Sequence, residues 1–215
     1  TREMAADFGP LGVRVNASRV GLALVALRGW PVLAIGIASL LAALAYMGGP
    51  RPIAYTPWGE FTVFVFFGLV AVPGTDWVIT GSTDGVTLLA AAAIGGIAAS
   101  ALVVNNHRDR LHDAQIGRST FVVRLGERAS QSLFAVLLSL PLLLPVGMAM
   151  LTSKPWLLLP CVLAPMGWRL YRDFVACPPG LAFNAILFRA FQLELWFAGL
   201  LSLGAVLSAH AHAGV

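Results

Sequence analysis

The sequence predicts an all-α protein, a polytopic bundle of transmembrane helices forming a single membrane domain over residues 1–215. Of the 215 residues, 58% are hydrophobic and only 11% are charged. A soluble globular domain has about 25% charged residues. The mean hydropathy is +0.82, and the apolar residues gather in runs that approach the roughly 20 residues needed to cross a bilayer. These observations exclude a soluble domain.

About six spans are predicted between residues 20 and 209. Residues 1–19 are polar and contain a Gly9-Pro10 break, which is typical of a loop. Residues 20–47 supply one crossing and not two, because the piece before Arg28 is too short to span on its own. The other predicted spans are residues 61–79, 86–104, 133–151, 155–170 and 193–209.

Small and kink-forming residues predict a local feature in two of these spans. Gly68, Pro73 and Gly74 predict a kink in span 61–79, which neighbouring helices can tolerate in a membrane. A small-residue face is predicted in span 86–104, where it allows close helix packing. It consists of Gly95, Gly96, Ala98 and Ala99.

The charged residues lie between the apolar runs and give a net charge of +4. Arginines gather in segments 48–60, 105–132 and 171–192, whereas segments 80–85 and 152–154 contain only Lys154. The positive-inside rule therefore places the first three segments on the cytoplasmic side. Basic residues at membrane flanks are not a nucleic-acid surface, so no nucleic-acid partner is expected.

One polar stretch, residues 105–126, carries most of the chemistry. Nothing breaks a helix before Gly117, so residues 105–113 are predicted to continue the preceding span as a helix. Asp109 and Asp113 then lie one turn apart on the same face, about 6 Å from each other. Two charges at that distance repel by roughly 3 kcal/mol at an effective dielectric near 20. A positive partner is therefore expected beside them.

Two positive partners are compatible with this spacing. Mg²⁺ takes oxygen ligands from one or two carboxylates and completes its coordination with water and substrate phosphate. Alternatively, nearby arginines neutralise the acids in a surface salt-bridge cluster. The candidates are Arg108, Arg110 and Arg118.

Three sequence blocks resemble one family. Residues 105–126, reading N-N-H-R-D-R-L-H-D-A-Q-I-G-R-S-T-F-V-V-R-L-G, resemble the second aspartate-rich motif of UbiA-type intramembrane prenyltransferases. They are most similar to the 1,4-dihydroxy-2-naphthoate prenyltransferases of menaquinone biosynthesis. Residues 48–75, beginning G-G-P-R-P-I-A-Y-T-P-W-G-E, resemble that family's segment around its fifth span. Residues 9–18, reading G-P-L-G-V-R-V-N-A-S, are similar to the loop after its first aspartate-rich motif.

The resemblance implies an activity and its partners. It implies transfer of a polyprenyl group from an isoprenoid diphosphate to a small aromatic acid, in particular 1,4-dihydroxy-2-naphthoate. Mg²⁺ is the implied cofactor, with Asp109 and Asp113 as its ligands and as catalytic residues. The implied location is the bacterial inner membrane, with segment 105–132 facing the cytoplasm. The chain is expected to be N-terminally incomplete, corresponding to the later spans of a nine-helix bundle.

The resemblance also implies two groups of binding residues. Tyr55 and Glu60 are the implied contacts of the aromatic acceptor; alternatively they are an interfacial aromatic and a helix N-terminal acid. For Arg118 and Arg124 the alternative is a positive-inside anchor, and for the asparagines it is helix-end capping. The implied diphosphate contacts are Asn105, Asn106, Arg108, Arg118, Arg124 and Arg14.

A second function also agrees with the sequence. The first aspartate-rich motif of the family is not found in these 215 residues. The alternative hypothesis is therefore a non-catalytic, truncated remnant that acts only as a lipid- or partner-binding membrane protein.

Overall fold

The computed structural model describes residues 17–178 and 180–213, and within these ranges the secondary structure is helical with no strand. The predicted all-α fold class is confirmed. In chain order the helices are α2 (Ala17–Arg28), α3 (Trp30–Met47), η2 (Ile53–Tyr55), α4 (Gly59–Val63), η3 (Phe64–Val70), α5 (Ala71–Thr80), α6 (Gly85–Gln115), α7 (Phe121–Leu125), α8 (Glu127–Thr152), η4 (Pro155–Leu163), α9 (Ala164–Ala176) and α10 (Phe183–Ala213).

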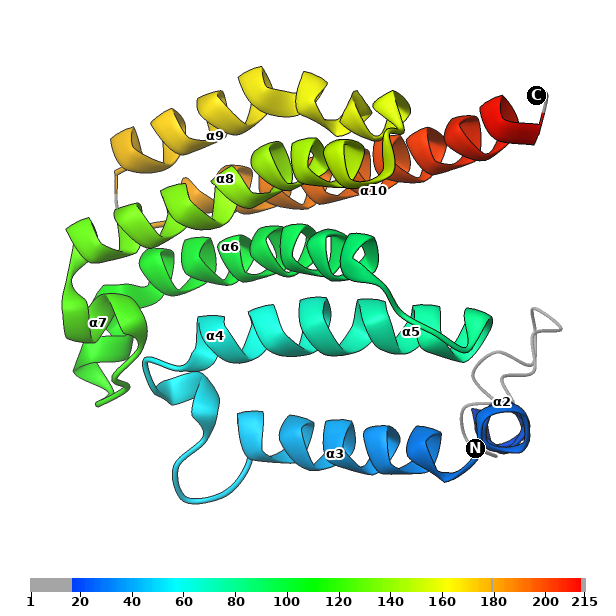
Figure 1. Ribbon diagram of the computed structural model, residues 1–215. Coiled ribbons are helices and arrows are strands. Elements are labelled where there is room, and N and C mark those ends of the chain that lie inside the picture. Colours follow the sequence, from blue (N-terminus) through cyan, green and yellow to red (C-terminus); the bar gives the residue numbers. More distant parts are fainter. Residues whose placement is uncertain (1–16, 179, 214–215) are drawn as a thin grey trace, which may run out of the picture.

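The long helices lie side by side, with α6 in the middle (Figure 1). Helices α4, η3 and α5 join into one continuous helix, Gly59–Thr80, which packs on one side of α6. Helices α8 and α10 pack against α6 as well, and η4 packs on both of them. Helix α3 lies at the outer edge beyond the Gly59–Thr80 helix, and α2 crosses the direction of the others (Figure 1).

Five helices in the described part of the chain are long and apolar enough to cross a membrane. They are Trp30–Met47, Gly59–Thr80, Gly85–Gln115, Glu127–Thr152 and Phe183–His210. The sixth predicted span, residues 155–170, is helical but divided into the 3₁₀ helix η4 and the α-helix α9. Pro155, Pro160 and Pro165 explain this irregularity, because each lacks the backbone N–H that a regular α-helix uses.

The first predicted span is bent at its start. Helix α2 begins at Ala17, inside the predicted loop 1–19, and ends where Gly29 takes a φ of 76°, a conformation that favours glycine. Helix α3 then crosses alone. Arg28 fixes this corner, since its Nε and Nη2 donate to Val78 O and Ile79 O at 2.8 and 2.7 Å. These carbonyls belong to the last turn of α5, which a cation stabilises.

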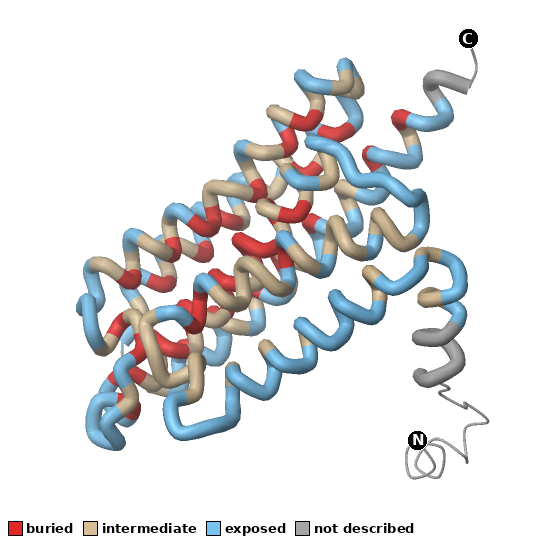
Figure 2. Tube along the Cα trace, turned by 60° about the horizontal axis from the view of Figure 1, so that its bottom comes forward, coloured by how far each residue is buried: buried red, intermediate tan, exposed pale blue. Residues whose placement is uncertain are grey.

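Most of the buried residues lie between α6, α8, α9 and α10, whereas α3 has no buried residue (Figure 2). Phe134 and Phe174 stack at 4.2 Å between ring centroids in this core. His107 packs on Phe174 and Phe183, with centroid distances of 4.8 and 5.3 Å. Large apolar side chains on the outside, such as Trp30 and Leu195, suit contact with lipid.

The predicted close packing at small residues of span 86–104 is confirmed at Gly95 and Gly96, which pack against two different helices. Gly95 lies against Gly68 of η3, and Gly96 lies against Leu137 and Leu140 of α8. The kink predicted in span 61–79 stays a prediction; the structure has a π-helical stretch there, η3, which contains Gly68. Such stretches widen the backbone locally and often occur at functional sites. The helix continues without a break through Pro73 and Gly74.

The start of α6 depends on a side-chain cap. The Oδ1 atom of Asp84 accepts a hydrogen bond from Thr87 N at 2.8 Å, and this bond lowers the pKa of Asp84. Asp84→Ala is expected to reduce the free energy of unfolding by about 1 kcal/mol. Because the folded pKa is depressed, the stabilisation is present above about pH 4 and is lost as pH falls through the folded pKa.

Thermal unfolding in detergent micelles at pH 7 and at pH 3 measures this contribution. Asp84→Asn is the control, because asparagine also caps helices but does not titrate. A variant Asp84→Ala as stable as the wild type at pH 7 contradicts the assigned cap.

Candidate functional site

Three connecting segments meet at one end of the bundle (Figure 1). They are the segment between α3 and α4, the turn from α6 through α7 to α8, and the start of α10. Ser119 N donates to Tyr55 O at 2.9 Å, and Arg108 Nη1 donates to Asn184 Oδ1 at 2.7 Å. These are the same three segments in which the sequence concentrates arginines.

The predicted loop 105–132 is mostly helical. Helix α6 runs on to Gln115, which confirms the predicted helix over residues 105–113. Helix α7 follows, and α8 begins at Glu127. The turns between them need glycine, since Gly117 and Gly126 have φ values of 76° and 86°. The acids are therefore held on a rigid helix end and not on a flexible loop.

Asp109 is bound by Arg108 through two parallel hydrogen bonds, Nε to Oδ1 and Nη2 to Oδ2, both of 2.7 Å. The same guanidinium donates to Asn105 Oδ1 at 2.8 Å. With the bond to Asn184, Arg108 joins the end of α6 to the start of α10. Bidentate arginine–carboxylate pairs fix the orientation of both groups.

Asp113 is buried, and its Oδ1 accepts from Arg118 Nη1 at 3.1 Å. This hydrogen bond raises the pKa of the Arg118 guanidinium above its usual value. The guanidinium carbon lies 4.1 Å from the centroid of the Tyr55 ring, a cation–π contact. Arg118 therefore connects Asp113 to Tyr55, one of the two predicted acceptor contacts.

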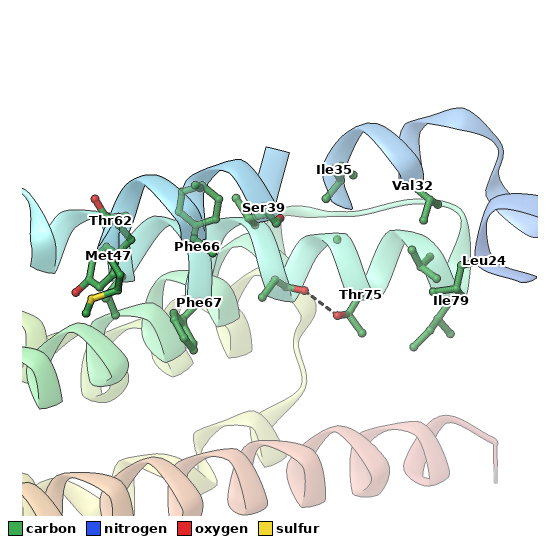
Figure 3. Close-up of a pocket in the computed structure, with 18 residues that line it drawn as sticks. Leu24, Val32, Ile35, Ser39, Met47, Thr62, Phe66, Phe67, Thr75 and Ile79 are labelled. Carbon is green, nitrogen blue, oxygen red and sulfur yellow. Dashed lines mark hydrogen bonds between the residues drawn. The ribbon is translucent and has the colours of Figure 1, made fainter. Parts of the chain in front are cut away.

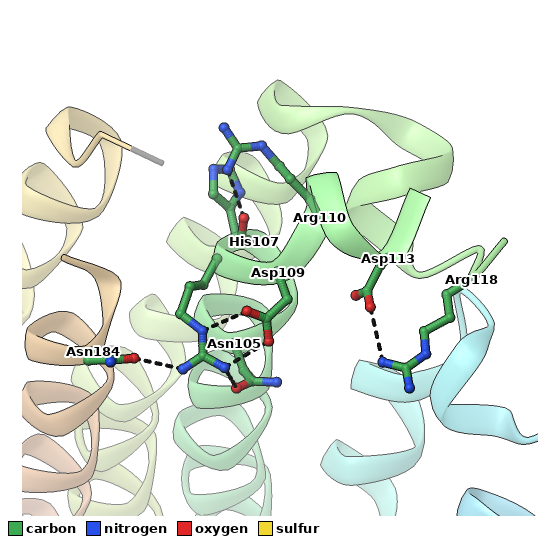
Figure 4. A network of polar contacts seen from close by, with 8 residues as sticks. Asn105, His107, Asp109, Arg110, Asp113, Arg118 and Asn184 are labelled. Carbon is green, nitrogen blue, oxygen red and sulfur yellow. Dashed lines mark hydrogen bonds and ion pairs between the residues drawn. The ribbon is translucent and has the colours of Figure 1, made fainter. Parts of the chain in front are cut away.

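The two carboxylates lie on the same side of α6, each turned toward its own arginine (Figure 4). The shared face predicted from their spacing is thus present. Arg118 also interacts electrostatically with Asp109. The two positive partners considered were Mg²⁺ and arginine, and the structure has an arginine at each acid. Within the described residues, no three His, Cys, Asp or Glu side chains form a metal cluster.

Arg110 is the exception to the predicted salt-bridge cluster. Its Nε donates to Glu127 Oε1 at 2.8 Å and its Nη1 to His107 O at 2.8 Å. The prediction that Arg110 neutralises the aspartates is wrong, because its guanidinium binds Glu127 at the start of α8.

The helix-capping interpretation of the two asparagines is also wrong, since both lie ahead of the last turns of α6. Asn105 binds Arg108, as described above. Asn106 is buried and its Nδ2 donates to Glu60 Oε1 at 2.8 Å. Asn106 therefore connects α6 to Glu60, the second predicted acceptor contact.

One predicted diphosphate contact, Arg124, is not part of this network. Arg124 is exposed on α7, and among the described residues its guanidinium has no hydrogen bond or ion pair. Arg14 lies outside the described residues. Conversely, the sequence interpretation missed Asn184, which lies 76 residues from its partner Arg108. No local pattern connects two residues so far apart.

A groove of about 700 Å³ runs between α3 and the Gly59–Thr80 helix (Figure 3). Its lining is mostly apolar and includes Phe66 and Phe67, and neither Asp109 nor Asp113 lines it. Tyr46 lines it at the end near the polar network. A Cβ atom placed on Gly59 would lie 3.8 Å from the Tyr46 hydroxyl. The groove therefore reaches Gly59, and the next residue, Glu60, contacts α6 through Asn106.

Comparison with known proteins identifies the family. The family model described as "UbiA prenyltransferase family" matches residues 17–192. The chain belongs to the UbiA prenyltransferase family. With five long apolar helices in its described residues, this UbiA-family chain is an integral membrane protein.

Three curated relatives have the printed name 1,4-dihydroxy-2-naphthoate octaprenyltransferase. The Mycobacterium tuberculosis protein is 38% identical over 149 residues, covering 69% of this chain and 50% of the relative. The Escherichia coli protein is 38% identical over 106 residues, or 49% and 34% of the two chains. The Bacillus subtilis protein is 26% identical over 190 residues, or 88% and 61%.

The UbiA-family chain spans about half the length of the first of these relatives. The comparison with solved structures gives no match.

Proposed function

We propose that this UbiA-family protein transfers a polyprenyl group from an isoprenoid diphosphate to an aromatic acceptor, 1,4-dihydroxy-2-naphthoate, in menaquinone biosynthesis. The observation that carries the proposal is the pair Asp109 and Asp113 on one side of α6, each with a guanidinium at its carboxylate. The names of the relatives supply the substrate class. The proposed location is the bacterial inner membrane, with residues 105–132 facing the cytoplasm.

The oxygen donors at the end of α6 fit Mg²⁺ delivered with a diphosphate. Asp109, Asp113 and Asn105 offer hard oxygen ligands from one helix, and Mg²⁺ is usually bound by one or two carboxylates plus substrate phosphates. When bound, Mg²⁺ supplies Lewis-acid stabilisation of the negative charge on the leaving oxygens. The proposed metal ligands and catalytic residues are Asp109 and Asp113.

The arginines of the site can bind both the carboxylates and a diphosphate. Arg108 and Arg118 hold the carboxylates in place, and a guanidinium also matches the geometry of phosphate oxygens. A bound diphosphate would therefore take over donors that now face Asp109 and Asp113. Such preorganised donors stabilise charge that develops on the leaving group. The proposed diphosphate contacts are Asn105, Asn106, Arg108, Arg118, Arg124 and Arg14.

The apolar groove is proposed to hold the prenyl chain. Its walls come from two helices that are each long enough to cross the membrane, so a chain can lie along them within the hydrocarbon region. Tyr46 marks the end at which the diphosphate would leave the groove for the acids on α6. The proposed acceptor contacts are Tyr55 and Glu60, because Tyr55 touches Arg118 and Glu60 touches Asn106.

A transfer assay tests the proposed function. Membranes containing the chain are incubated with radiolabelled octaprenyl diphosphate, 1,4-dihydroxy-2-naphthoate and Mg²⁺, and the extracted lipid is separated by chromatography. A prenylated naphthoquinol precursor is expected, and EDTA is expected to abolish its formation. Membranes containing the Mycobacterium tuberculosis relative are the positive control. Absence of product while the control is active contradicts the proposal.

One observation favours a second candidate, a non-catalytic lipid-binding protein. Both acids already have arginine partners, so the polar end is electrostatically balanced without a metal. This function predicts that octaprenyl diphosphate binds in EDTA as tightly as in Mg²⁺ and that no transfer follows. Equilibrium binding with and without Mg²⁺ separates the two functions.

A further inference from the structure

One buried carboxylate oxygen near the acids is unpaired. Glu60 is 4% exposed, and its Oε1 accepts from Asn106 at 2.8 Å. Its Oε2 is buried and, among the described residues, has no hydrogen-bond partner. Leaving a buried carboxylate oxygen without a donor is costly. Such an unsatisfied buried atom in a native structure is often explained by a bound ligand or by a role in function.

The position of Glu60 is between the groove and the acid pair. Tyr46, which lines the groove, has its hydroxyl beside Gly59, the residue before Glu60. Asn106, on the other side of Glu60, lies three residues before Asp109 on α6. A molecule bound at Glu60 Oε2 would therefore lie near the place where a prenyl chain in the groove meets a diphosphate held by α6.

A carboxylate oxygen accepts hydrogen bonds and does not donate them. Glu60 is the second residue of the Gly59–Thr80 helix, where the free N–H groups of the first turn stabilise negative charge. The Asn106 amide adds a donor. The Asn106 amide donates to Oε1, so Oε2 is still without a donor. A hydroxyl group of a bound molecule supplies one.

We infer that Glu60 Oε2 accepts a hydrogen bond from a ring hydroxyl of the aromatic acceptor, with Asn106 as a positioning residue that orients the carboxylate. The inference rests on the proposed function and specifies which acceptors the site selects. A hydroxyl bonded to a carboxylate releases electron density into its ring, so the ring carbon becomes a better nucleophile. The site should therefore prefer hydroxylated aromatic acids to the same acids carrying a methoxy group.

Calorimetric titration of the purified 215-residue chain in detergent tests this preference without catalysis. The ligands are 1-hydroxy-2-naphthoate and 1-methoxy-2-naphthoate, with neither Mg²⁺ nor diphosphate present. The wild type is expected to bind the hydroxy compound about 10- to 100-fold more tightly, as for a hydrogen bond to a charged group. Glu60→Gln keeps the size and the bond to Asn106 but replaces the free acceptor with an NH₂ donor. It is expected to reduce the preference to about threefold or less.

Two variants separate this role from general effects on folding. Glu194→Gln makes the same chemical change on α10, away from Glu60 and the acid pair, and should leave the preference unchanged. Asn106→Ala should weaken the preference while binding of the methoxy compound stays within twofold, which a merely structural role would not produce. If Glu60→Gln does not fold, the wild-type comparison of the two ligands decides alone.

Three outcomes overturn the inference. They are equal affinity of the wild type for the two ligands, no binding of the hydroxy compound, and an undiminished preference in folded Glu60→Gln. None of them depends on transfer. If the chain prefers the hydroxy ligand but makes no product, only the proposed function is contradicted. If the chain catalyses transfer but Glu60→Gln keeps the full preference, only the inference is contradicted.

Discussion

Asp109→Ala and Asp113→Asn are each expected to reduce Mg²⁺-dependent prenyl transfer at least 100- to 1,000-fold. Losing one preorganised electrostatic group at a leaving-group site commonly has an effect of this size. Each substitution removes one of the two carboxylates that α6 presents on one side (Figure 4). Asparagine is chosen at position 113 because Asp113 is 3% exposed and alanine would leave a cavity. Initial rates over a range of Mg²⁺ concentrations measure both the loss and any change in metal affinity.

The matched control is Asp173→Ala. Asp173 is also an acid in an ion pair, with Arg189, at the same end of the bundle, but it lies on α9 outside the candidate site. Exposed ion pairs contribute about 0–1 kcal/mol, so this variant should keep near-wild-type transfer. Retention of more than a tenth of the rate by either the Asp109 or the Asp113 variant would show that the carboxylates serve only to hold their arginines.

The fold was predictable from the sequence where local patterns decide it. Apolar runs of membrane-spanning length occur in few other contexts, so the helices around residues 61–79, 86–104 and 133–151 follow directly from hydropathy. The helix through residues 105–113 was predictable because no Gly or Pro interrupts it before Gly117. The spacing of Asp109 and Asp113 on that helix then gave their shared face.

The site was less predictable because its partners are distant in sequence. The bonds from Arg108 to Asn184 and from Asn106 to Glu60 join residues 76 and 46 positions apart. Which arginine pairs with which acid depends on side-chain direction, and Arg110 turns to Glu127 for that reason. The predicted span 155–170 is divided into η4 and α9 because of its prolines. The effect of a proline on helix pitch depends on the packing around it, so hydropathy alone does not predict the division.

Gly68→Ala and Gly95→Ala are expected to have the largest effects on stability. A Cβ atom on Gly68 would lie 2.5 Å from Ala91 O and 2.8 Å from Gly95 Cα, and one on Gly95 would lie 2.7 Å from Phe64 O. These neighbours are backbone atoms, which cannot rotate away. Each variant must therefore separate η3 from α6, at a cost of about 1–3 kcal/mol or more.

Unfolding by SDS titration in mixed micelles measures this loss, with Gly74→Ala as the control. Gly74 lies on the same long helix, but a Cβ atom there meets nothing within 4 Å. Alanine has the higher helix propensity, so Gly74→Ala should be neutral or stabilising by up to about 1 kcal/mol. Equal destabilisation by Gly74→Ala and Gly68→Ala would mean that the close approach of the two backbones is not the cause.

The two glycines share one crossing, which makes their combined effect informative. Once Gly68→Ala has separated the helices, the Cβ atom of Gly95→Ala occupies space that is already open, so the double variant should lose less than the sum of the single losses. The same separation would move Glu60, which begins the Gly59–Thr80 helix, away from Asn106 on α6. Gly68→Ala should therefore weaken both the preference for hydroxylated ligands and the stability, whereas Gly74→Ala should weaken neither.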